Sequence, residues 1–269
     1  MNLMGKVIWI TGASSGIGEA IAQELIKEGC KLILSARRLE ELNRVRNNIK
    51  LADKDILVLP IDLEQHQQVD DWVTKVMDKF NQIDILINNG GISQKSSALA
   101  TNTAVERKIM DINYFGNVAL AKAVARIMIQ QKSGKIAVIS SIIGKFGLPD
   151  LSTYSASKHA LYGFYDSFRM ELKDANINIL IVSPGFINTN VAINSIKGDG
   201  NLVNENSPAM EKGMKTNVFA KKFIQTLKSN TNHKFIGKNE ILAVPFKVVF
   251  PSIFYKLVLK LSKKKSDDR

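Results

Sequence analysis

The sequence has little cysteine and little histidine. Cys30 is the single cysteine among 269 residues, so the chain can form neither an internal disulfide nor a cysteine-based metal cluster. The three histidines, His66, His159 and His233, are scattered along the chain, and we assign none of them to a metal or to catalysis. A chain without disulfides suits a reducing compartment, so we expect a cytoplasmic protein without a metal site.

Long apolar runs are also missing. No window holds the roughly 18 consecutive apolar residues that a membrane-spanning helix requires. The opening residues, MNLMGKVIWITGASSG, contain an apolar run only as long as a strand and do not resemble an export signal. We therefore do not expect an integral membrane protein. The hydrophobic content of 45% is enough for a sizeable core, and the length suits one α/β domain.

Positive charge is abundant and unevenly distributed. The formal net charge is +12, and residues 201–269 hold 14 Lys and Arg against 5 Asp and Glu. Nucleic acid, an anionic membrane surface, or a lysine-rich composition without a function would each explain this surplus. Because the chain has no recognised nucleic-acid-binding motif, we expect no nucleic-acid partner.

Six apolar runs of strand length alternate with helical patterns of ten or more residues. Continuous apolar runs are typical of strands buried on both faces, and parallel neighbours need crossover helices between them. The sequence therefore predicts a single α/β domain of three α/β/α layers around a Rossmann-like, doubly wound parallel sheet. The six runs are 6–11, 31–36, 55–60, 84–88, 135–140 and 178–183.

The domain is expected to span residues 1–243 and to be followed by a tail, 244–269. Within it, residues 190–215 are rich in Gly and Asn and show no clear periodicity. We interpret this segment as a mobile insert beside the substrate.

The first strand is followed by a glycine-rich turn, TGASSGIGEA. Ligands of such sheets bind at the carboxyl ends of the strands, and glycines let the backbone approach a pyrophosphate at the amino end of a helix. A tight turn without any ligand would also use glycine. We expect this turn to bind a dinucleotide through Gly12, Ser14, Ser15, Gly16, Ile17 and Gly18.

The glycine-rich turn is followed by further motifs at Asn88–Gly91 and at Pro184–Thr189, with Asn113, Ser141, Tyr154 and Lys158 between them. Together they resemble the short-chain dehydrogenase/reductase family, and the resemblance runs from the first strand to about residue 190. Gly90 stands where the family has alanine, and we expect the loss of one methyl to loosen that turn slightly. The resemblance implies that Asp62, with Leu63, contacts adenine. The family motifs are matched by Thr11, Gly12, Gly16 and Gly18, then Asn88-Asn89-Gly90-Gly91, and finally Pro184, Gly185 and Thr189, which are further expected cofactor contacts.

The resemblance also implies a catalytic set of Asn113, Ser141, Tyr154 and Lys158. Tyr154 and Lys158 are four residues apart and so project from one face of a helix. A free phenol has a pKa of about 10, and we expect the ammonium, together with an oxidised nicotinamide, to lower it. Tyr154 is then the general acid/base, and Lys158 tunes it and holds the nicotinamide ribose. Ser141 would hydrogen-bond the substrate oxygen, and Asn113 would hold a proton-relaying water.

The cofactor is expected to be NADP(H). The second strand ends in Ser35-Ala36-Arg37-Arg38, with no carboxylate before Glu40 to bind free ribose hydroxyls. A guanidinium fits the 2′-phosphate, so we expect Arg37 and Arg38 to contact it. The alternative is that the two arginines only begin a solvated helix.

The substrate is expected to be a small, apolar alcohol, ketone or aldehyde. No arginine is placed to bind an anionic substrate, and the apolar residues near the predicted site could equally be ordinary core. The sequence therefore predicts an NADP(H)-dependent oxidoreductase that forms a homo-oligomer; the alternative is a non-catalytic NADP(H)-binding sensor or scaffold. The apolar residues in question are Ile92, Ile142, Phe146, Leu148 and Phe186.

The tail is predicted to form an amphipathic helix from about Pro251. Phe254, Leu257, Val258 and Leu261 would lie on one side, and Lys256, Lys260 and Lys263 on another. Such a helix can lie in the interface of an anionic membrane, an arrangement similar to that of membrane-associated family members with lipid-like substrates. The alternative is that the apolar side packs on the sheet edge or on a second subunit.

Overall fold

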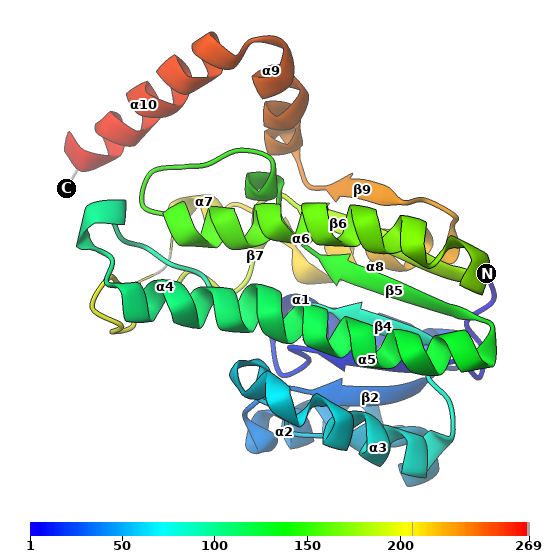
Figure 1. The fold of residues 1–269 in the computed structure, drawn as a ribbon. Coiled ribbons are helices and arrows are strands. Elements are labelled where there is room, and N and C mark those ends of the chain that lie inside the picture. Colours follow the sequence, from blue (N-terminus) through cyan, green and yellow to red (C-terminus); the bar gives the residue numbers. More distant parts are fainter. Residues whose placement is uncertain (206, 268–269) are drawn as a thin grey trace.

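The fold is built on a parallel sheet of seven strands in the order β3–β2–β1–β4–β5–β6–β9 (Figure 1). The computed structural model describes residues 1–205 and 207–267, with side chains described through residue 262. This arrangement confirms the predicted doubly wound sheet. The strands are β1 (Val7–Thr11), β2 (Lys31–Ser35), β3 (Ile56–Val58), β4 (Ile85–Asn88), β5 (Gly134–Ile139), β6 (Ile177–Pro184) and β9 (His233–Ile236).

The strand order reverses at β1, which pairs with β2 on one side and with β4 on the other. Ile8 is in register with Leu32 of β2 and with Ile85 of β4. All five residues of β1 are buried, which explains its uninterrupted apolar sequence. Two strands differ from the prediction, since β3 at one edge is shorter than the apolar run 55–60, and β9 at the other edge was not predicted.

Helices cover both faces of the sheet. On one face α1, α2 and α8 pack against Ile8, Ile10 and their neighbours, and on the other α3, α5 and α6 pack against Val7 and Trp9. Alternate residues of a strand point to opposite faces, so each strand supplies both cores. The helices are α1 (Gly16–Leu25), α2 (Leu39–Ile49), α3 (Val69–Phe80), α4 (Thr103–Met110), α5 (Gly116–Gln131), α6 (Ser152–Glu171) and α8 (Thr216–Lys228).

The predicted insert, 190–215, is attached beside the loop that follows β4. The backbone of Ile196 pairs with Ser93 and Lys95, and its side chain is buried against Val105 and Ile109. The segment also contains the short helix α7 (Pro208–Glu211) and the strand β8 (Met214–Lys215), which pairs with β7 (Ile187–Asn188).

Beyond β9 the chain forms an arm of two helices, α9 (Ala243–Val249) and α10 (Pro251–Asp267). Figure 1 shows α9 rising from the body and α10 extending from it toward the carboxyl edge of the sheet. The apolar side predicted for the tail is divided. Phe254 is buried and Val258 partly buried against the body, whereas Leu257 and Leu261 are exposed. The turn at Phe250 decides this, because it sets which side of α10 faces the protein. The predicted position of the Lys263 side chain lies outside the described residues.

No helix within residues 1–205 and 207–267 is long and apolar enough to cross a bilayer.

Candidate active site

The glycine-rich turn leaves β1 and enters α1 in a conformation that its glycines make possible. Gly12 and Gly16 have φ values of 64° and 59°, in the left-handed region that favours glycine. A Cβ on Gly18 would lie 2.2 Å from the Gly12 oxygen, so α1 packs directly on the turn. Ser15, the residue before α1, makes no side-chain capping bond within the described residues. The amide groups and this hydroxyl together suit a pyrophosphate.

The turn after β4 is bonded to the turn after β1. The Thr11 hydroxyl accepts the N–H groups of Asn89 and Gly90, and Asn89 Nδ2 donates to the carbonyl oxygens of Thr11 and Gly12. A Cβ on Gly90 would lie 2.7 Å from Leu63 Cδ1, so Leu63 occupies the space of the missing methyl. The looser turn expected at Gly90 is therefore compensated by packing.

Tyr154 lies in the first turn of α6, and its hydroxyl lies close enough to Ser141, which follows β5, for Ser141 to lower its pKa. Part of the Tyr154 residue is exposed, but its phenol group is enclosed. Burial raises the pKa of Tyr154 to about 12, against the smaller lowering effect of Ser141. This differs from the expected lowering, because in the protein chain alone the cost of burying a phenolate outweighs any help from Lys158.

Lys158 lies one turn further along α6, with its Nζ 5.8 Å from the centre of the Tyr154 ring. The ammonium donates to the Ile139 carbonyl oxygen at 3.0 Å, and burial lowers its pKa to about 8. A Cβ on Gly91 would be 3.6 Å from this Nζ and 3.0 Å from Asn113 Oδ1. Lys158 and Asn113 therefore both lie against the turn that follows β4.

Asn113 occupies a π-helical segment, Asp111–Phe115, between α4 and α5. Its Nδ2 donates to the Ile92 oxygen and to Ser157 Oγ, and its Oδ1 accepts the Ile92 N–H. Such single π-turns are frequent at functional sites. Since these three bonds occupy both amide protons and the amide oxygen, the side chain of Asn113 joins the β4 turn to α6.

Two positioning residues escaped the sequence analysis. Gln94 is fully buried, and its Oε1 accepts the N–H groups of Thr153 and Tyr154 at the start of α6. Ser157 accepts from Asn113 and donates to the Tyr154 carbonyl oxygen. A signal for Gln94 was available, because α6 begins after Leu151, which cannot cap a helix, so its free N–H groups needed a distant acceptor.

The predicted phosphate-binding arginines lie apart from Tyr154, after β2. Arg37 and Arg38 are exposed, and neither has an ion pair within the described residues. Arg44 of α2, which was not predicted, binds Glu19 and Glu41 and donates to the Ser14 carbonyl oxygen at 3.2 Å. These bonds hold α2 against the glycine-rich turn, and two carboxylates already neutralise the Arg44 guanidinium.

The remaining predicted cofactor residues also lie at the carboxyl edge. Asp62 accepts the Glu64 N–H after β3, which leaves its second oxygen available. Pro184 ends β6, and the Gly185 N–H donates to the Ile236 oxygen. Thr189 faces Gly16, where an added Cβ would lie 3.2 Å from Thr189 Cγ2. A groove of about 340 Å³ lies beside Thr189, between α1 and the segment that follows β7. Of the predicted cofactor residues it includes Ser15, Gly16 and Thr189, and the rest of its lining is Glu19, Ala20, Gln23, Asn188, Asn190 and Thr216.

Tyr154 packs against an apolar cluster formed by residues of the β5 loop and the arm. Ile142 and Phe146 are buried there with Val244 and Phe254, and the Phe146 and Phe254 ring centres are 5.0 Å apart. Leu148 is partly buried against the same cluster. Of the other predicted lining residues, Ile92 packs in two different clusters, and Phe186 lies on the loop after β6.

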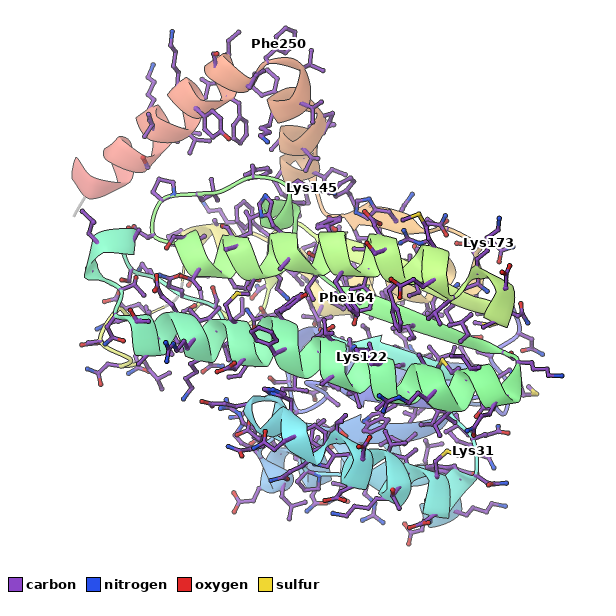
Figure 2. All side chains as sticks on the ribbon, viewed as in Figure 1. Lys31, Lys122, Lys145, Phe164, Lys173 and Phe250 are labelled. Atoms are coloured by element: carbon purple, nitrogen blue, oxygen red, sulfur yellow. The ribbon has the colours of Figure 1, made fainter. Side chains whose placement is uncertain are left out.

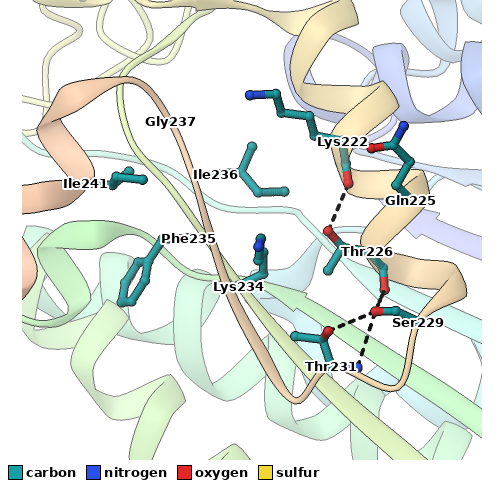
Figure 3. A pocket seen from close by; sticks show the side chains of 10 residues that line it. All are labelled: Lys222, Gln225, Thr226, Ser229, Thr231, Lys234, Phe235, Ile236, Gly237 and Ile241. Carbon is teal, nitrogen blue, oxygen red and sulfur yellow. Dashed lines mark hydrogen bonds between the residues drawn. The ribbon is translucent and has the colours of Figure 1, made fainter.

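A second hollow, of about 460 Å³, lies between α8 and β9 (Figure 3). None of the predicted site residues lines it. Its hydroxyl groups bond within the wall, since Thr226 donates to the Lys222 oxygen and Ser229 to the oxygens of Thr226 and Thr231. This hollow is separate from the catalytic edge.

Comparison with known proteins agrees with this geometry. A family model described as short chain dehydrogenase matches residues 6–200. The chain belongs to the short-chain dehydrogenase/reductase family. The Dehydrogenase/reductase SDR family protein 7-like of Drosophila melanogaster is 44% identical over 230 residues, which cover 84% of this chain and 71% of that protein. Human Dehydrogenase/reductase SDR family member 7 is 37% identical over 273 residues, covering 99% and 80%.

Solved structures share the fold. A short-chain dehydrogenase/reductase from Burkholderia phymatum in complex with NAD has a TM-score of 0.78 at 20% identity, covering 87% of this chain and 90% of that one. An alcohol dehydrogenase from Thermococcus sibiricus complexed with 5-hydroxy-NADP has a TM-score of 0.75 at 22% identity, covering 87% and 97%. The chain is thus an oxidoreductase of a family whose fold binds a nicotinamide cofactor.

The close packing of Gly18 makes a prediction. Gly18→Ala should lower the free energy of unfolding by about 1–3 kcal/mol, because the new methyl meets backbone that cannot move aside. Urea denaturation measures this effect. The matched control is Gly163→Ala, at an exposed position of α6. Nothing lies within 4 Å of a Cβ added there, so the higher helix propensity of alanine should stabilise the protein by about 0.5–1 kcal/mol. Equal effects at the two positions would contradict the interpretation.

Proposed function

We propose that the protein is an NADP(H)-dependent oxidoreductase that acts on an apolar carbonyl or alcohol, with Tyr154 as the general acid/base. The observation that carries the proposal is the pairing of Tyr154 with Ser141 beside the Lys158 ammonium, under an apolar cover. A non-catalytic sensor would need the cofactor site but not this proton donor, so no observation favours that alternative.

The cofactor groove fits a dinucleotide. The turn after β1 offers backbone N–H groups at the start of α1, and its glycines leave room that a Cβ would fill. Glycine residues 12, 16 and 18, with Ser14, Ser15 and Ile17, would hold the pyrophosphate. Asp62 and Leu63 would contact the adenine, and the β4 turn, Lys158 and the loop 184–189 would hold the nicotinamide end. When bound, the cofactor supplies or accepts the hydride.

The residues of the site then move the proton. At neutral pH the Tyr154 phenol is protonated, since burial raises its pKa to about 12. It can therefore donate its proton to a substrate oxygen as negative charge develops there, and Ser141 can donate a second hydrogen bond to the same oxygen. The Lys158 ammonium stabilises the phenolate that remains. Asn113 and Gln94 hold these groups in place rather than exchanging protons.

Removal of the phenolic proton is the direct test. Tyr154→Phe should lower kcat by roughly two orders of magnitude or more while leaving NADPH affinity nearly unchanged, because the ring stays and only the acid is lost. A screen of aldehydes and ketones, followed at the reduced-nicotinamide absorbance band, supplies the assay. Tyr255→Phe in the arm is the matched control and should retain activity. Near-normal turnover of the Tyr154 variant would refute the mechanism.

The choice of NADP(H) rests on Arg37. Arg37 and Arg38 follow β2 with no carboxylate partner among the described residues, whereas Arg44 nearby is neutralised by Glu19 and Glu41. An unpaired guanidinium at this position gains a charge-assisted bond from a 2′-phosphate but nothing comparable from free ribose hydroxyls.

Arg37→Ala should therefore weaken NADPH binding about 10- to 100-fold, as expected for the loss of a charged hydrogen-bond partner. NADH binding should change little, because NADH lacks the phosphate. Titration of both reduced cofactors by fluorescence measures the two affinities. Arg107→Ala, an exposed arginine of α4, controls for the loss of one positive charge. Equal losses for NADPH and NADH would show that Arg37 does not recognise the phosphate.

We also propose that the arm makes peripheral contact with an anionic membrane. Most of the apolar side chains of α9 and α10 do not pack on the body, and Phe250 lies at the outer turn between the two helices (Figure 2). Lys247, Lys256 and Lys260 accompany them, which suits a negatively charged interface. An apolar substrate could then reach Tyr154 from the bilayer beside Phe254. The exposed residues are Val248, Val249, Phe250, Ile253, Tyr255, Leu257, Leu259 and Leu261.

Vesicle co-sedimentation tests the arm. The protein should sediment with phosphatidylserine-containing vesicles at low salt and less at high salt, because salt screens the lysines. Replacing Phe250 and Ile253 with Ser should release the protein from the vesicles, because both apolar side chains are exposed and would otherwise enter the membrane interface. Leu99→Ser, at an exposed position outside the arm, is the control. A wild-type protein that stays in the supernatant at both salt concentrations would rule out membrane contact.

A homo-oligomer remains part of the proposal. Members of the family commonly form oligomers, and on this chain the large apolar side chains of Phe115, directly before α5, and of Ile129, within α5, are exposed. Such side chains would be covered if the outer face of α5 met a second copy.

A further inference from the structure

The base of the arm meets the cofactor loop at one carboxylate. Glu240 lies in the short helical turn Asn239–Leu242 that leads into α9. Its Oε1 accepts the N–H of Phe186 at 2.9 Å and the N–H of Lys238 at 3.0 Å. Glu240 forms no ion pair within the described part of the chain. A partly buried acid is therefore satisfied by main-chain donors from two separate segments, one of which is the loop that follows β6.

Two glycines make room for this carboxylate. A Cβ on Gly185 would lie 2.0 Å from Glu240 Oε1, and a Cβ on Gly237 would lie 2.7 Å from the same oxygen. Neither glycine has a positive φ, so space and not backbone conformation requires them. Figure 3 shows Gly237 where the chain leaves β9 toward Ile241. Any larger residue at either position would displace the carboxylate from the two N–H groups.

Phe186 connects Glu240 to the cofactor groove. Its carbonyl oxygen accepts the Met214 N–H at 2.8 Å, and the next residues form β7, which pairs with β8. Thr189 follows directly and faces Gly16 of the glycine-rich turn. The bond from Phe186 to Glu240 is thus three residues from a wall of the groove.

The other side of Glu240 leads to the substrate side. Ile241, Ala243 and Val244 follow it in the chain and pack in the same apolar cluster as Tyr154 and Phe254. A single side chain therefore joins the loop beside the cofactor groove to the segment that covers the catalytic tyrosine.

We propose that Glu240 is a positioning residue for the nicotinamide cofactor, which holds the loop 184–189 in the conformation that binds it. The inference rests on the proposed cofactor site. Without the Glu240 oxygen, the Phe186 N–H loses its acceptor and the loop gains conformational freedom. Cofactor binding must then remove that freedom, which weakens affinity without changing any residue that contacts the cofactor.

The test measures NADPH dissociation constants by fluorescence titration, without any substrate. Glu240→Ala should weaken binding about tenfold, whereas Glu240→Gln, whose amide oxygen can accept both N–H groups, should stay within about threefold of wild type. Gly237→Ala keeps the acid but displaces it, so it should match Glu240→Ala. Glu171→Ala, an exposed acid on α6, controls for the change in charge and should bind like the wild type.

Hydrogen–deuterium exchange separates positioning from general stability. In Glu240→Ala without cofactor, the Phe186 amide should exchange faster while the amides of β5 and β6 keep their wild-type protection. Wild-type affinity in Glu240→Ala, or equal weakening in the Ala and Gln variants, would overturn the inference. Absence of NADPH binding by the wild type would instead overturn the proposed cofactor site, so the two failures are distinguishable.

Discussion

The bonded contact between the turns after β1 and β4 is the constraint on which the rest of the site depends. The Thr11 hydroxyl accepts the Asn89 N–H, and Asn89 Nδ2 donates to the Thr11 carbonyl oxygen. These bonds lie where the strand order reverses, so the two turns keep a constant separation. Gly18 then packs on Gly12, which starts α1 at the edge of the groove. Each of these bonds joins a side chain of one turn to the backbone of the other, so two short side chains, Thr11 and Asn89, hold the two turns together.

Burial sets the protonation of Tyr154 and Lys158, the proposed catalytic pair. The same desolvation raises the pKa of Tyr154 and lowers that of Lys158, because it penalises the charged form of each. The enclosure comes from distant segments, since Phe146 precedes α6 and Phe254 lies a hundred residues beyond Tyr154. The state of the arm therefore bears directly on the proton donor, and Glu240 gives the same arm a contact with the cofactor loop.

Much of the fold was predictable because its signals are local. The runs that became β1, β2, β4, β5 and β6 are mostly apolar, as is typical of strands buried on both faces. The edge strand β9 was not predicted because its sequence, HKFI, contains only two apolar residues after a histidine and an exposed lysine, which is too short an apolar run to indicate a strand. The meeting of Ser141, Tyr154 and Lys158 was also predictable, since the carboxyl ends of parallel strands share one edge of the sheet; their catalytic roles stay a prediction.

The sequence by itself determined the sheet, its ligand edge, the motif residues on that edge and the helical period of the tail. Tertiary structure decided the roles of Gln94, Arg44 and Glu240, each of which has a bonding partner 25 to 60 residues away in the chain. It also decided that Phe254 faces inward and Leu257 outward. The reason is physical: the period of a buried face is written in neighbouring residues, whereas a hydrogen-bond partner depends on how the chain closes in space.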